Sequence, residues 1–441
     1  MQAMPDSPAC SANNLTKVTY PDGTSRQYLY NESAHINNGS SCTSSSYGQA
    51  IGSGFGNLLN ALTGLIDENN VRYISWGYSC SGHAIRSSLA GGVNDILLSY
   101  DFNSNPLYQV LRADVITTTG DPSAPVTVPT KTFYPTLVLD VSKNSSVSAP
   151  CFVCGSITSR SFDADGNVSK TVDWNGSVTT FTYDLTRNLE ITRTEASGTA
   201  NARTITTVWH PTLRLPVTIA QPKLITNFTY DDNGNVLSRS EQATNDISGA
   251  SGTAAVAVGS PRISTYTYNA YGQITSAVGP RTDIVDKTTY DYDAKGNLAI
   301  VTNALGQATT YSNYDDNGNV GRIVEPNGLV TEFSYTPRGK IASRTVSDGA
   351  SRETTSFTYD PAGQLIKQTN PDGSWMAYGY DPAHRLISVN DNLGNSITYT
   401  LDLTGNRIGE QVKDPAGVLS RQVARVFNTL GQMTKVTGAV Q

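Results

Sequence analysis

The stretch YDAKGNLAIVTNALGQATTYSNYDDNGNV, residues 292–320, carries the pattern that decides the fold. Within it, an aromatic residue followed by Asp and, three residues after the Asp, by Gly starts at position 292 and again at position 314. The Asp side chain can start a type I turn by capping a backbone amide, and Gly readily adopts the left-handed conformation that a G1 bulge requires. Each copy of this motif therefore predicts the tight turn of a β-hairpin.

The same motif recurs along most of the chain at a regular spacing. From position 272 onward, the glycine or its replacement falls at 272, 296, 318, 339, 363, 384, 405 and 431, in steps of 21 to 26 residues. A second turn sequence, such as NALG at 303–306, lies about halfway through most units, so each unit is expected to hold two strands. The copies of the motif are FDADGNV (162–168), YDDNGNV (230–236), YNAYGQI (268–274), YDAKGNL (292–298), YDDNGNV (314–320), YTPRGKI (335–341), YDPAGQL (359–365), YDPAHRL (380–386), LDLTGNRI (401–408) and FNTLGQM (427–433).

The residues between the turns alternate in the way that half-buried strands do. Phe333 and Tyr335 fall on the same face of one predicted strand, and Phe357 and Tyr359 fall on the same face of another. One face should therefore carry a column of aromatic rings, and the other face should carry Thr and Ser. The predicted fold class is all-β, with antiparallel β-hairpin repeats that form one long ribbon.

The N-terminal third is a divergent version of this array. The sequence predicts two segments, residues 1–155 with β structure and irregular loops, and residues 156–441 with the regular repeats. The less regular stretches are interpreted as a surface loop at 37–54, a loop or one short turn at 56–67, and a proline-rich crossing between sheet segments at 117–150. Further hairpins are predicted at 16–30, 69–84 and 207–220.

Composition and charge argue against several classes of protein. The formal net charge is −6 and the 31 Lys and Arg residues are scattered, so neither nucleic acid nor an anionic membrane is an expected partner. No apolar run approaches the roughly 18 residues that a membrane-spanning helix needs. The five cysteines, Cys10, Cys42, Cys80, Cys151 and Cys154, all precede residue 155, so the stability of the regular repeats cannot depend on disulfides.

Two groups of polar residues could hold a metal ion, but both fit structural roles better. Asp163, Asp165 and Gly166 resemble the start of a calcium loop, as does the stretch 231–235, yet position 12 of the first is Trp174 where such a loop needs a closing Glu. We interpret both as turn sequences. The Cys151–Cys154 pair could be half of a zinc site or a redox pair, but neither a second such pair nor a helix is predicted, which favours a structural disulfide or buried thiols.

The remaining candidates give no catalytic constellation. The four histidines, His35, His83, His210 and His384, stand far apart, and His384 occupies the glycine position of its repeat, where a turn-tolerant polar residue is expected. The stretch GSGFG (52–56) and the Gly339–Lys340 pair do not complete a phosphate-binding loop, and carboxylates such as Asp315 and Asp316 are expected at solvated turn tips. The sequence predicts no catalytic, cofactor-binding or metal site, and the chain is not expected to be an enzyme.

The repeated unit resembles that of the bacterial RHS/YD-repeat family, most clearly across residues 228–433. The stretches LTKVTYPDGTSRQYLY (15–30), LTGLIDENNVRYISW (62–76) and TVWHPTLRLPVTI (207–219) also resemble sequence of that family. The resemblance implies a long curved ribbon of hairpins that forms part of a hollow shell. In this family such shells enclose a toxic C-terminal segment, and related repeats occur in adhesion proteins of animals.

The resemblance also sets the functional expectations. The chain is expected to be a non-catalytic shell segment that encapsulates or delivers a secreted toxin, with a toxin segment or a second shell protein as partner. Because the family's C-terminal core and toxin domain are not recognisable, we expect a fragment of a larger secreted or cell-surface protein, and any autoproteolytic or nuclease activity is expected in a part absent from this sequence. The alternative is an extracellular surface that binds carbohydrate or protein, because exposed Tyr rings can stack on sugars.

Overall fold

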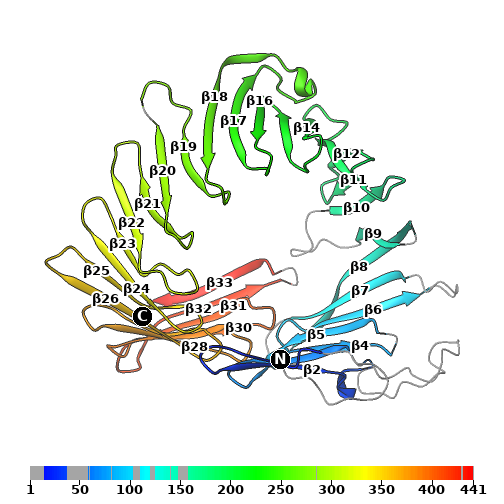
Figure 1. Ribbon diagram of the computed structural model, residues 1–441. Helices are drawn as coiled ribbons and strands as arrows, with labels where there is room; N and C mark the ends of the chain where they lie inside the picture. Colours follow the sequence, from blue (N-terminus) through cyan, green and yellow to red (C-terminus); the bar gives the residue numbers. More distant parts are fainter. Residues whose placement is uncertain are drawn as a thin grey trace. The chain divides into compact units, whose positions relative to one another are not determined.

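The computed structural model describes residues 14–36, 58, 60–80, 82–102, 110–119, 125–139, 141–147, 157–284, 286–428 and 431–440. Within these ranges the protein consists of 33 β-strands and three short 3-10 turns, with no α-helix (Figure 1). The all-β prediction is therefore confirmed. None of the helical turns in the described ranges has the length and apolar character that crossing a membrane would require.

The chain divides into two compact units that do not follow the order of the sequence. The first contains Met1–Thr132, Phe333–Val346 and Arg352–Gln441, and the second contains Phe133–Glu332 and Ser347–Ser351. The first unit thus combines an early part of the chain with the last repeats. The division of the sequence at residue 155 rests on the regularity of the repeats and stays a prediction.

The first unit contains strands from both ends of the chain. Its N-terminal strands are β1 (Lys17–Thr19), β2 (Ser25–Tyr30), β3 (Leu62–Ile66), β4 (Arg72–Tyr78), β5 (Ala84–Leu89), β6 (Ile96–Phe102) and β7 (Val110–Thr119), with the 3-10 turns η1 (Ser33–His35) and η4 (Ala90–Gly92). Its C-terminal strands are β26 (Arg352–Tyr359), β27 (Leu365–Thr369), β28 (Trp375–Tyr380), β29 (Leu386–Asp391), β30 (Ser396–Leu401), β31 (Arg407–Lys413), β32 (Leu419–Phe427) and β33 (Met433–Val440). Strand β25 (Ile341–Ser347) lies in this unit except for its last residue.

The second unit is one uninterrupted series of strands. Strands β8 (Val126–Val138) and β24 (Val330–Tyr335) each have one part in this unit and one part in the other. Between them lie β9 (Val141–Val147), β10 (Ile157–Phe162), β11 (Val168–Asp173), β12 (Val178–Asp184), β13 (Leu189–Glu195), β14 (Arg203–Trp209), β15 (Pro216–Gln221), β16 (Leu224–Tyr230), β17 (Val236–Thr244), η5 (Gly252–Ala254), β18 (Ala257–Tyr268), β19 (Ile274–Val278), β20 (Lys287–Tyr292), β21 (Leu298–Thr302), β22 (Ala308–Ser312) and β23 (Arg322–Val324).

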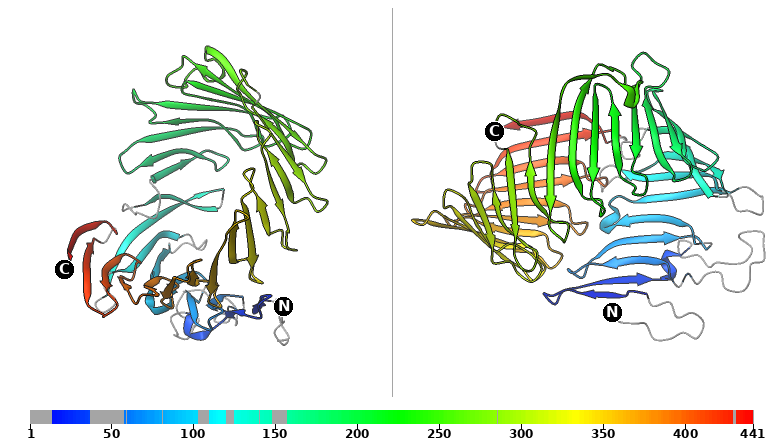
Figure 2. Two further views of the ribbon diagram at one scale, coloured as in Figure 1. Left: turned by 90° about the vertical axis from the view of Figure 1, so that its left-hand side faces the viewer. Right: turned by 45° about the horizontal axis from the view of Figure 1, so that its top comes forward.

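Strand pairing is antiparallel and joins strands that are consecutive in the sequence. This holds from β1 to β7 and from β26 to β33 in the first unit, and from β8 to β24 in the second. Figure 2 shows consecutive strands lying side by side in chain order. The predicted hairpins at 16–30, 69–84 and 207–220 are confirmed by the pairs β1–β2, β4–β5 and β14–β15.

One local prediction is wrong. Residues 56–67 were expected to form a loop or one short turn, but Leu62–Ile66 form β3, because Leu65 pairs with Tyr28 on one side and Ile74 on the other. Pairing on both edges overrides a local pattern that looks helical. Residues 117–150, interpreted from the sequence as a crossing between sheet segments, contain β8, which has residues in both units, and the β8–β9 hairpin, in which a register shift at Pro135 accommodates the missing amide donor. The predicted surface loop at 37–54 lies outside the described residues.

The turns have the geometry that the motif predicts. In the motif at 292–298, the Asp293 amide donates to the Asn297 carbonyl at 2.8 Å and the Gly296 amide donates to the Asp293 carbonyl at 3.0 Å. The Gly296 φ angle is 86°, and the strand register shifts at Tyr292, which pairs with Leu298. This is a hairpin closed by a G1 bulge, and the halfway turn repeats it, with a φ angle of 76° at Gly306.

The two faces of the strands differ in chemistry, as predicted. On the aromatic face, the ring centroids of Phe333 and Tyr335 are 6.4 Å apart and those of Phe228 and Tyr230 are 6.3 Å apart. Hydroxyl groups pair across neighbouring strands elsewhere, at Thr182–Thr192 (2.6 Å), Thr194–Thr204 (3.0 Å), Thr229–Ser238 (2.7 Å), Ser334–Ser343 (2.6 Å) and Thr345–Thr354 (2.9 Å). Only ten apolar residues of the described chain are buried, with exposures of 1 to 9%, so most stabilising contacts lie within the sheet.

A second recurring interaction links many of the repeats to the one before. The motif tyrosine donates its hydroxyl hydrogen bond to the backbone carbonyl of the first residue of the preceding strand, which is the apolar residue that closes the previous motif. The bonds are Tyr183 to Val168 (3.0 Å), Tyr268 to Val236 (3.0 Å), Tyr292 to Ile274 (2.9 Å), Tyr314 to Leu298 (2.6 Å), Tyr359 to Ile341 (3.0 Å) and Tyr380 to Leu365 (3.0 Å). We call this series the tyrosine ladder.

The substitution Gly306→Val should destabilise the protein. A β-branched residue at a φ angle of 76° should cost at least about 1–2 kcal/mol of unfolding free energy, although the space around this position is open. Urea unfolding of the full chain measures the effect, and Leu305→Ala, at an 82% exposed position of the same turn, serves as the control. Equal stability of both variants would contradict the assignment of this turn.

The substitution Tyr292→Phe tests the tyrosine ladder. It removes the donor to the Ile274 carbonyl while keeping the ring, so the free energy of unfolding should fall by about 1 kcal/mol. Tyr271→Phe is the matched control, because Tyr271 lies at a turn tip with 88% of its surface exposed. Denaturant unfolding compares the two, and a loss of similar size in both variants would show that the ladder hydroxyl adds nothing specific.

Candidate functional site

The most regular concentration of polar groups in the molecule is the row of motif turns. In most of the motif turns that begin with Asp, a carboxylate oxygen accepts hydrogen bonds from the amides two and four residues later, for example from Asn233 (3.0 Å) and Asn235 (2.8 Å) to Asp231. The Asn235 side-chain amide donates to the second oxygen at 2.8 Å. Both carboxylate oxygens of Asp231 therefore accept hydrogen bonds from within the turn itself.

These hydrogen bonds have an electrostatic consequence. The bond from the Asn side chain four residues later lowers the pKa of Asp231, and the same contact lowers the pKa of Asp293, Asp315 and Asp391. A carboxyl group with a depressed pKa stabilises the fold above its unfolded pKa, and this contribution is lost as the pH falls through the folded pKa. The turns are thus fully stabilised at neutral pH.

The two predicted calcium-like sequences are turns in the structure. Asp163 accepts the amides of Asp165 at 3.0 Å and Asn167 at 2.8 Å, in the same way as Asp231. In the part of the chain that the structure describes, no three His, Cys, Asp or Glu residues are arranged to hold a metal ion. The prediction that these stretches serve turn formation is confirmed by the bonds they make. Cys151 and Cys154 lie outside the described residues, and Cys80 takes part in a disulfide.

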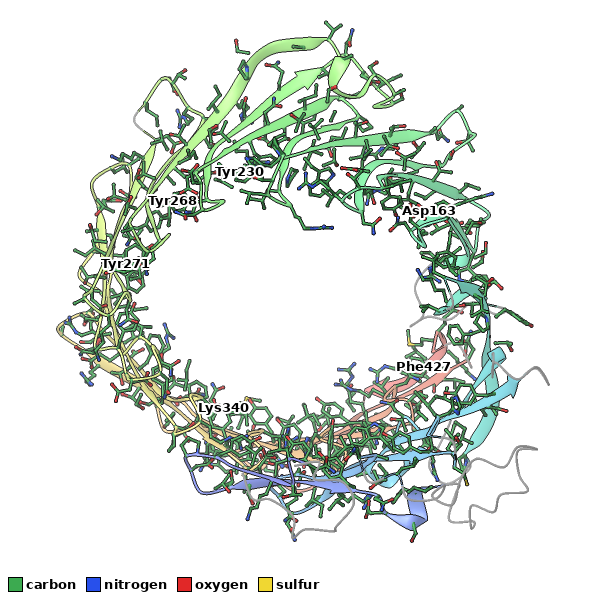
Figure 3. All side chains as sticks on the ribbon, turned by 45° about the vertical axis from the view of Figure 1, so that its right-hand side comes forward. Asp163, Tyr230, Tyr268, Tyr271, Lys340 and Phe427 are labelled. Carbon is green, nitrogen blue, oxygen red and sulfur yellow. The ribbon has the colours of Figure 1, made fainter. Side chains whose placement is uncertain are left out.

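The residue after the motif glycine connects neighbouring turns. The Gln273 side-chain amide donates to the Gly296 carbonyl at 2.7 Å, and Arg385 Nη1 donates to the Asp402 carbonyl at 2.6 Å. The ammonium group of Lys340, marked in Figure 3, lies 5.4 Å from the ring centroid of Tyr359. Asn, Gln, Lys or Arg follows the glycine in the motif copies, but the sequence did not predict the contact of this residue with the next repeat.

The four histidines have four separate environments. His384 has a φ angle of 62°, which confirms that it fills a left-handed turn position, but its Nε2 also lies 2.7 Å from Asp67 Oδ2. His210 Nδ1 accepts the Leu213 amide at 3.1 Å, and the ring centroid of His83 lies 5.5 Å from that of Tyr100. The contact between His384 and Asp67 was not predicted from the sequence, where its only signal is a histidine in place of the motif glycine.

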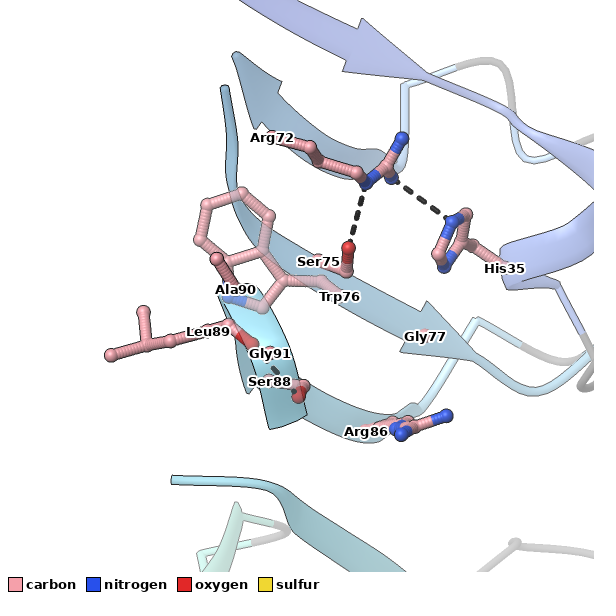
Figure 4. Close-up of a pocket in the computed structure, with 10 residues that line it drawn as sticks. All are labelled: His35, Arg72, Ser75, Trp76, Gly77, Arg86, Ser88, Leu89, Ala90 and Gly91. Atoms are coloured by element: carbon pink, nitrogen blue, oxygen red, sulfur yellow. Dashed lines mark hydrogen bonds between the residues drawn. The ribbon is translucent and has the colours of Figure 1, made fainter. Parts of the chain in front are cut away.

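His35 borders a pocket of about 260 Å³ in the first unit, at strands β4 and β5 (Figure 4). Arg72 donates to both Glu32 oxygens at 2.9 and 2.8 Å, and Arg86 forms an ion pair with Asp95 at 2.8 Å. Burial lowers the pKa of His35, and Arg72 lowers it further, so the imidazole is neutral at pH 7. The two arginines of the lining are therefore neutralised by Glu32 and Asp95. The pocket is lined by His35, Arg72, Ser75, Trp76, Gly77, Arg86, Ser88, Leu89, Ala90 and Gly91.

Two family models match the repeats. Residues 251–400 match the model described as Teneurin YD-shell, and residues 162–200 match the model described as RHS Repeat. Among curated relatives, the tRNA3(Ser)-specific nuclease WapA of Bacillus spizizenii is 40% identical over 155 residues, and the tRNA nuclease WapA of Bacillus subtilis is 39% identical over 155 residues. Each alignment covers 33% of this chain and 6% of the relative, so the chain corresponds to a small part of those proteins.

Solved structures share the fold at low sequence identity. TcdB2-TccC3 without its hypervariable C-terminal region gives a TM-score of 0.61 at 13% identity, with 94% of this chain and 22% of that chain covered. The Tc holotoxin pore of Photorhabdus luminescens gives a TM-score of 0.59 at 15% identity, with 97% of this chain and 24% of that chain covered. The motif spacing, the hairpin geometry and the two family models agree that the repeats of this chain are of the RHS/YD type.

Proposed function

We propose that this chain is a non-catalytic wall segment of an RHS/YD-repeat shell that encloses a polypeptide, in keeping with the toxin segments that such shells hold. It acts as part of a larger secreted or cell-surface protein, and its partners are the enclosed segment and further shell sequence. The observation that carries the proposal is the joining of consecutive hairpins by strand pairing and by the tyrosine ladder.

A wall requires a sheet that is stable without a thick apolar core. The burial pattern supports this role, because strand residues are mostly half-buried and few apolar side chains are fully buried. Stability then comes from contacts between neighbouring strands, which leaves both faces of the sheet available for contact with solvent or a second polypeptide. The polar groups support a non-catalytic role, because the motif carboxylates are occupied by their own turns.

A second candidate function is carbohydrate binding. The pocket at β4 and β5 favours it, because an indole ring, Trp76, stands beside the hydroxyls of Ser75 and Ser88 and the guanidinium group of Arg86. Aromatic rings with adjacent polar groups suit sugar rings. A glycan array separates the functions: a carbohydrate-binding surface gives a sugar-specific signal that Trp76→Ala removes, whereas a wall segment gives none.

The full-length gene product that contains these residues should retain a polypeptide within its protease-resistant part. After limited proteolysis, native size-exclusion chromatography followed by mass spectrometry should find residues 157–428 largely intact and a second, non-covalently held polypeptide in the same peak. Digestion after unfolding in guanidinium is the control, and it should leave neither intact repeats nor a retained polypeptide. Recovery of the repeat region alone, with no retained polypeptide, would overturn the proposed enclosing role.

A further inference from the structure

The tip of the β3–β4 hairpin contacts three motif turns that lie far away in the sequence but in the same unit. Asp67 Oδ2 lies 2.7 Å from His384 Nε2, Arg338 Nη2 donates to Glu68 Oε1 at 2.9 Å, and Asn69 Nδ2 donates to Asp360 Oδ2 at 2.9 Å. The partners are 317, 270 and 291 residues apart in the chain. Three successive residues of one hairpin tip thus bind three successive repeats.

The acidic residues of this tip are buried by the contact. The Glu68 side chain has no exposed surface and lies between Arg338 and Arg26, whose Nη2 is 3.2 Å from Glu68 Oε2. A buried carboxylate is strongly destabilising unless it is paired, so Glu68 depends on the arginine that the distant repeat supplies. Asp67 is only 2% exposed, and its Oδ1 accepts the amides of Asn69 at 3.0 Å and Val71 at 2.8 Å, which fixes the shape of the tip.

His384 departs from the repeat in a way that serves this contact. A non-glycine residue at a φ angle of 62° is strained relative to the glycine that the other motif copies have. In this position the imidazole stacks on Tyr73, with ring centroids 4.3 Å apart and an interplanar angle of 18°, and reaches Asp67. Glycine could make neither contact.

The contact differs in kind from the strand pairs of the ribbon. One backbone hydrogen bond accompanies it, from the Asn94 amide to the Leu403 carbonyl at 2.8 Å, whereas β30 and β31 pair over six residues. The other contacts described above are made by charged and polar side chains. Removing one partner of such a pair leaves the other polar group buried without its partner, whereas the strand pairs of the ribbon do not depend on any single side chain.

We propose that the tip residues Asp67, Glu68 and Asn69 and their partners Arg338, Asp360 and His384 form a reversible clasp. The row of motif turns is a docking surface for an acidic hairpin tip, and residues 67–69 occupy it. When the clasp is released, the first unit opens along this line while the individual hairpins stay folded. This device is separate from enclosure and does not rest on the proposed function.

Hydrogen exchange at the Asn94 amide reports on the clasp, because Asn94 lies among the N-terminal strands of the first unit and its acceptor, Leu403, lies among the C-terminal repeats. His384→Gly restores the repeat's glycine and removes backbone strain, so a residue that only fills a turn would leave exchange unchanged or slower. The clasp predicts the opposite change in the exchange rate. Exchange at Asn94 should become at least about tenfold faster in His384→Gly and in Arg338→Ala, because each substitution removes a contact between the tip and the repeats.

Arg281→Ala is the matched control, because Arg281 pairs with Asp283 only two residues away and bridges no distant segments. It should leave the Asn94 exchange rate unchanged. Far-UV circular dichroism should keep its β-sheet signal in both clasp variants. Unchanged exchange in both clasp variants would overturn the proposal, and so would faster exchange spread evenly over all strands.

Discussion

The hydrogen bond from a repeat tyrosine to the first carbonyl of the preceding strand, made by six tyrosines of the ladder, is the interaction on which the ribbon depends. Glycine turns alone produce hairpins, and an isolated hairpin is at best marginally stable in water. The tyrosine hydroxyl adds a fixed link between one motif and the next, from Tyr268 to Val236 and again from Tyr292 to Ile274. It also satisfies a carbonyl at the start of a strand. A repeating ribbon without a thick core follows from this link.

At two places without a ladder tyrosine, another side chain donates a hydrogen bond to a backbone carbonyl of a neighbouring repeat. Trp209 Nε1 donates to the Glu190 carbonyl at 2.8 Å, which reproduces the ladder with an indole donor. At position 401 the aromatic residue is replaced by Leu, and there Arg385 reaches the Asp402 carbonyl from the preceding turn. At these two places a different side chain therefore links one repeat to a neighbouring one.

The sequence predicts the periodic part of the structure well, because each turn is determined by residues within seven positions of one another. The left-handed glycines, the aromatic face and the Thr and Ser face all follow from that local pattern. The β3 strand could not be predicted in the same way, since its conformation depends on partners at Tyr28 and Ile74. The contact of residues 67–69 with the last repeats has no local signature except His384, which stands where the pattern requires glycine.

The tyrosine ladder is tested most directly by spectrophotometric titration of tyrosine in the folded full chain. Burial raises the pKa of the ladder tyrosines, which include Tyr183, Tyr268, Tyr292, Tyr314, Tyr359 and Tyr380. Their stabilising contribution is full below the unfolded pKa of about 10 and is lost as the pH rises through the folded pKa. The account predicts a distinct class of tyrosines that ionises above that value and whose ionisation coincides with loss of β structure. A single transition at the pKa of free tyrosine, with the β-sheet signal intact, would contradict it.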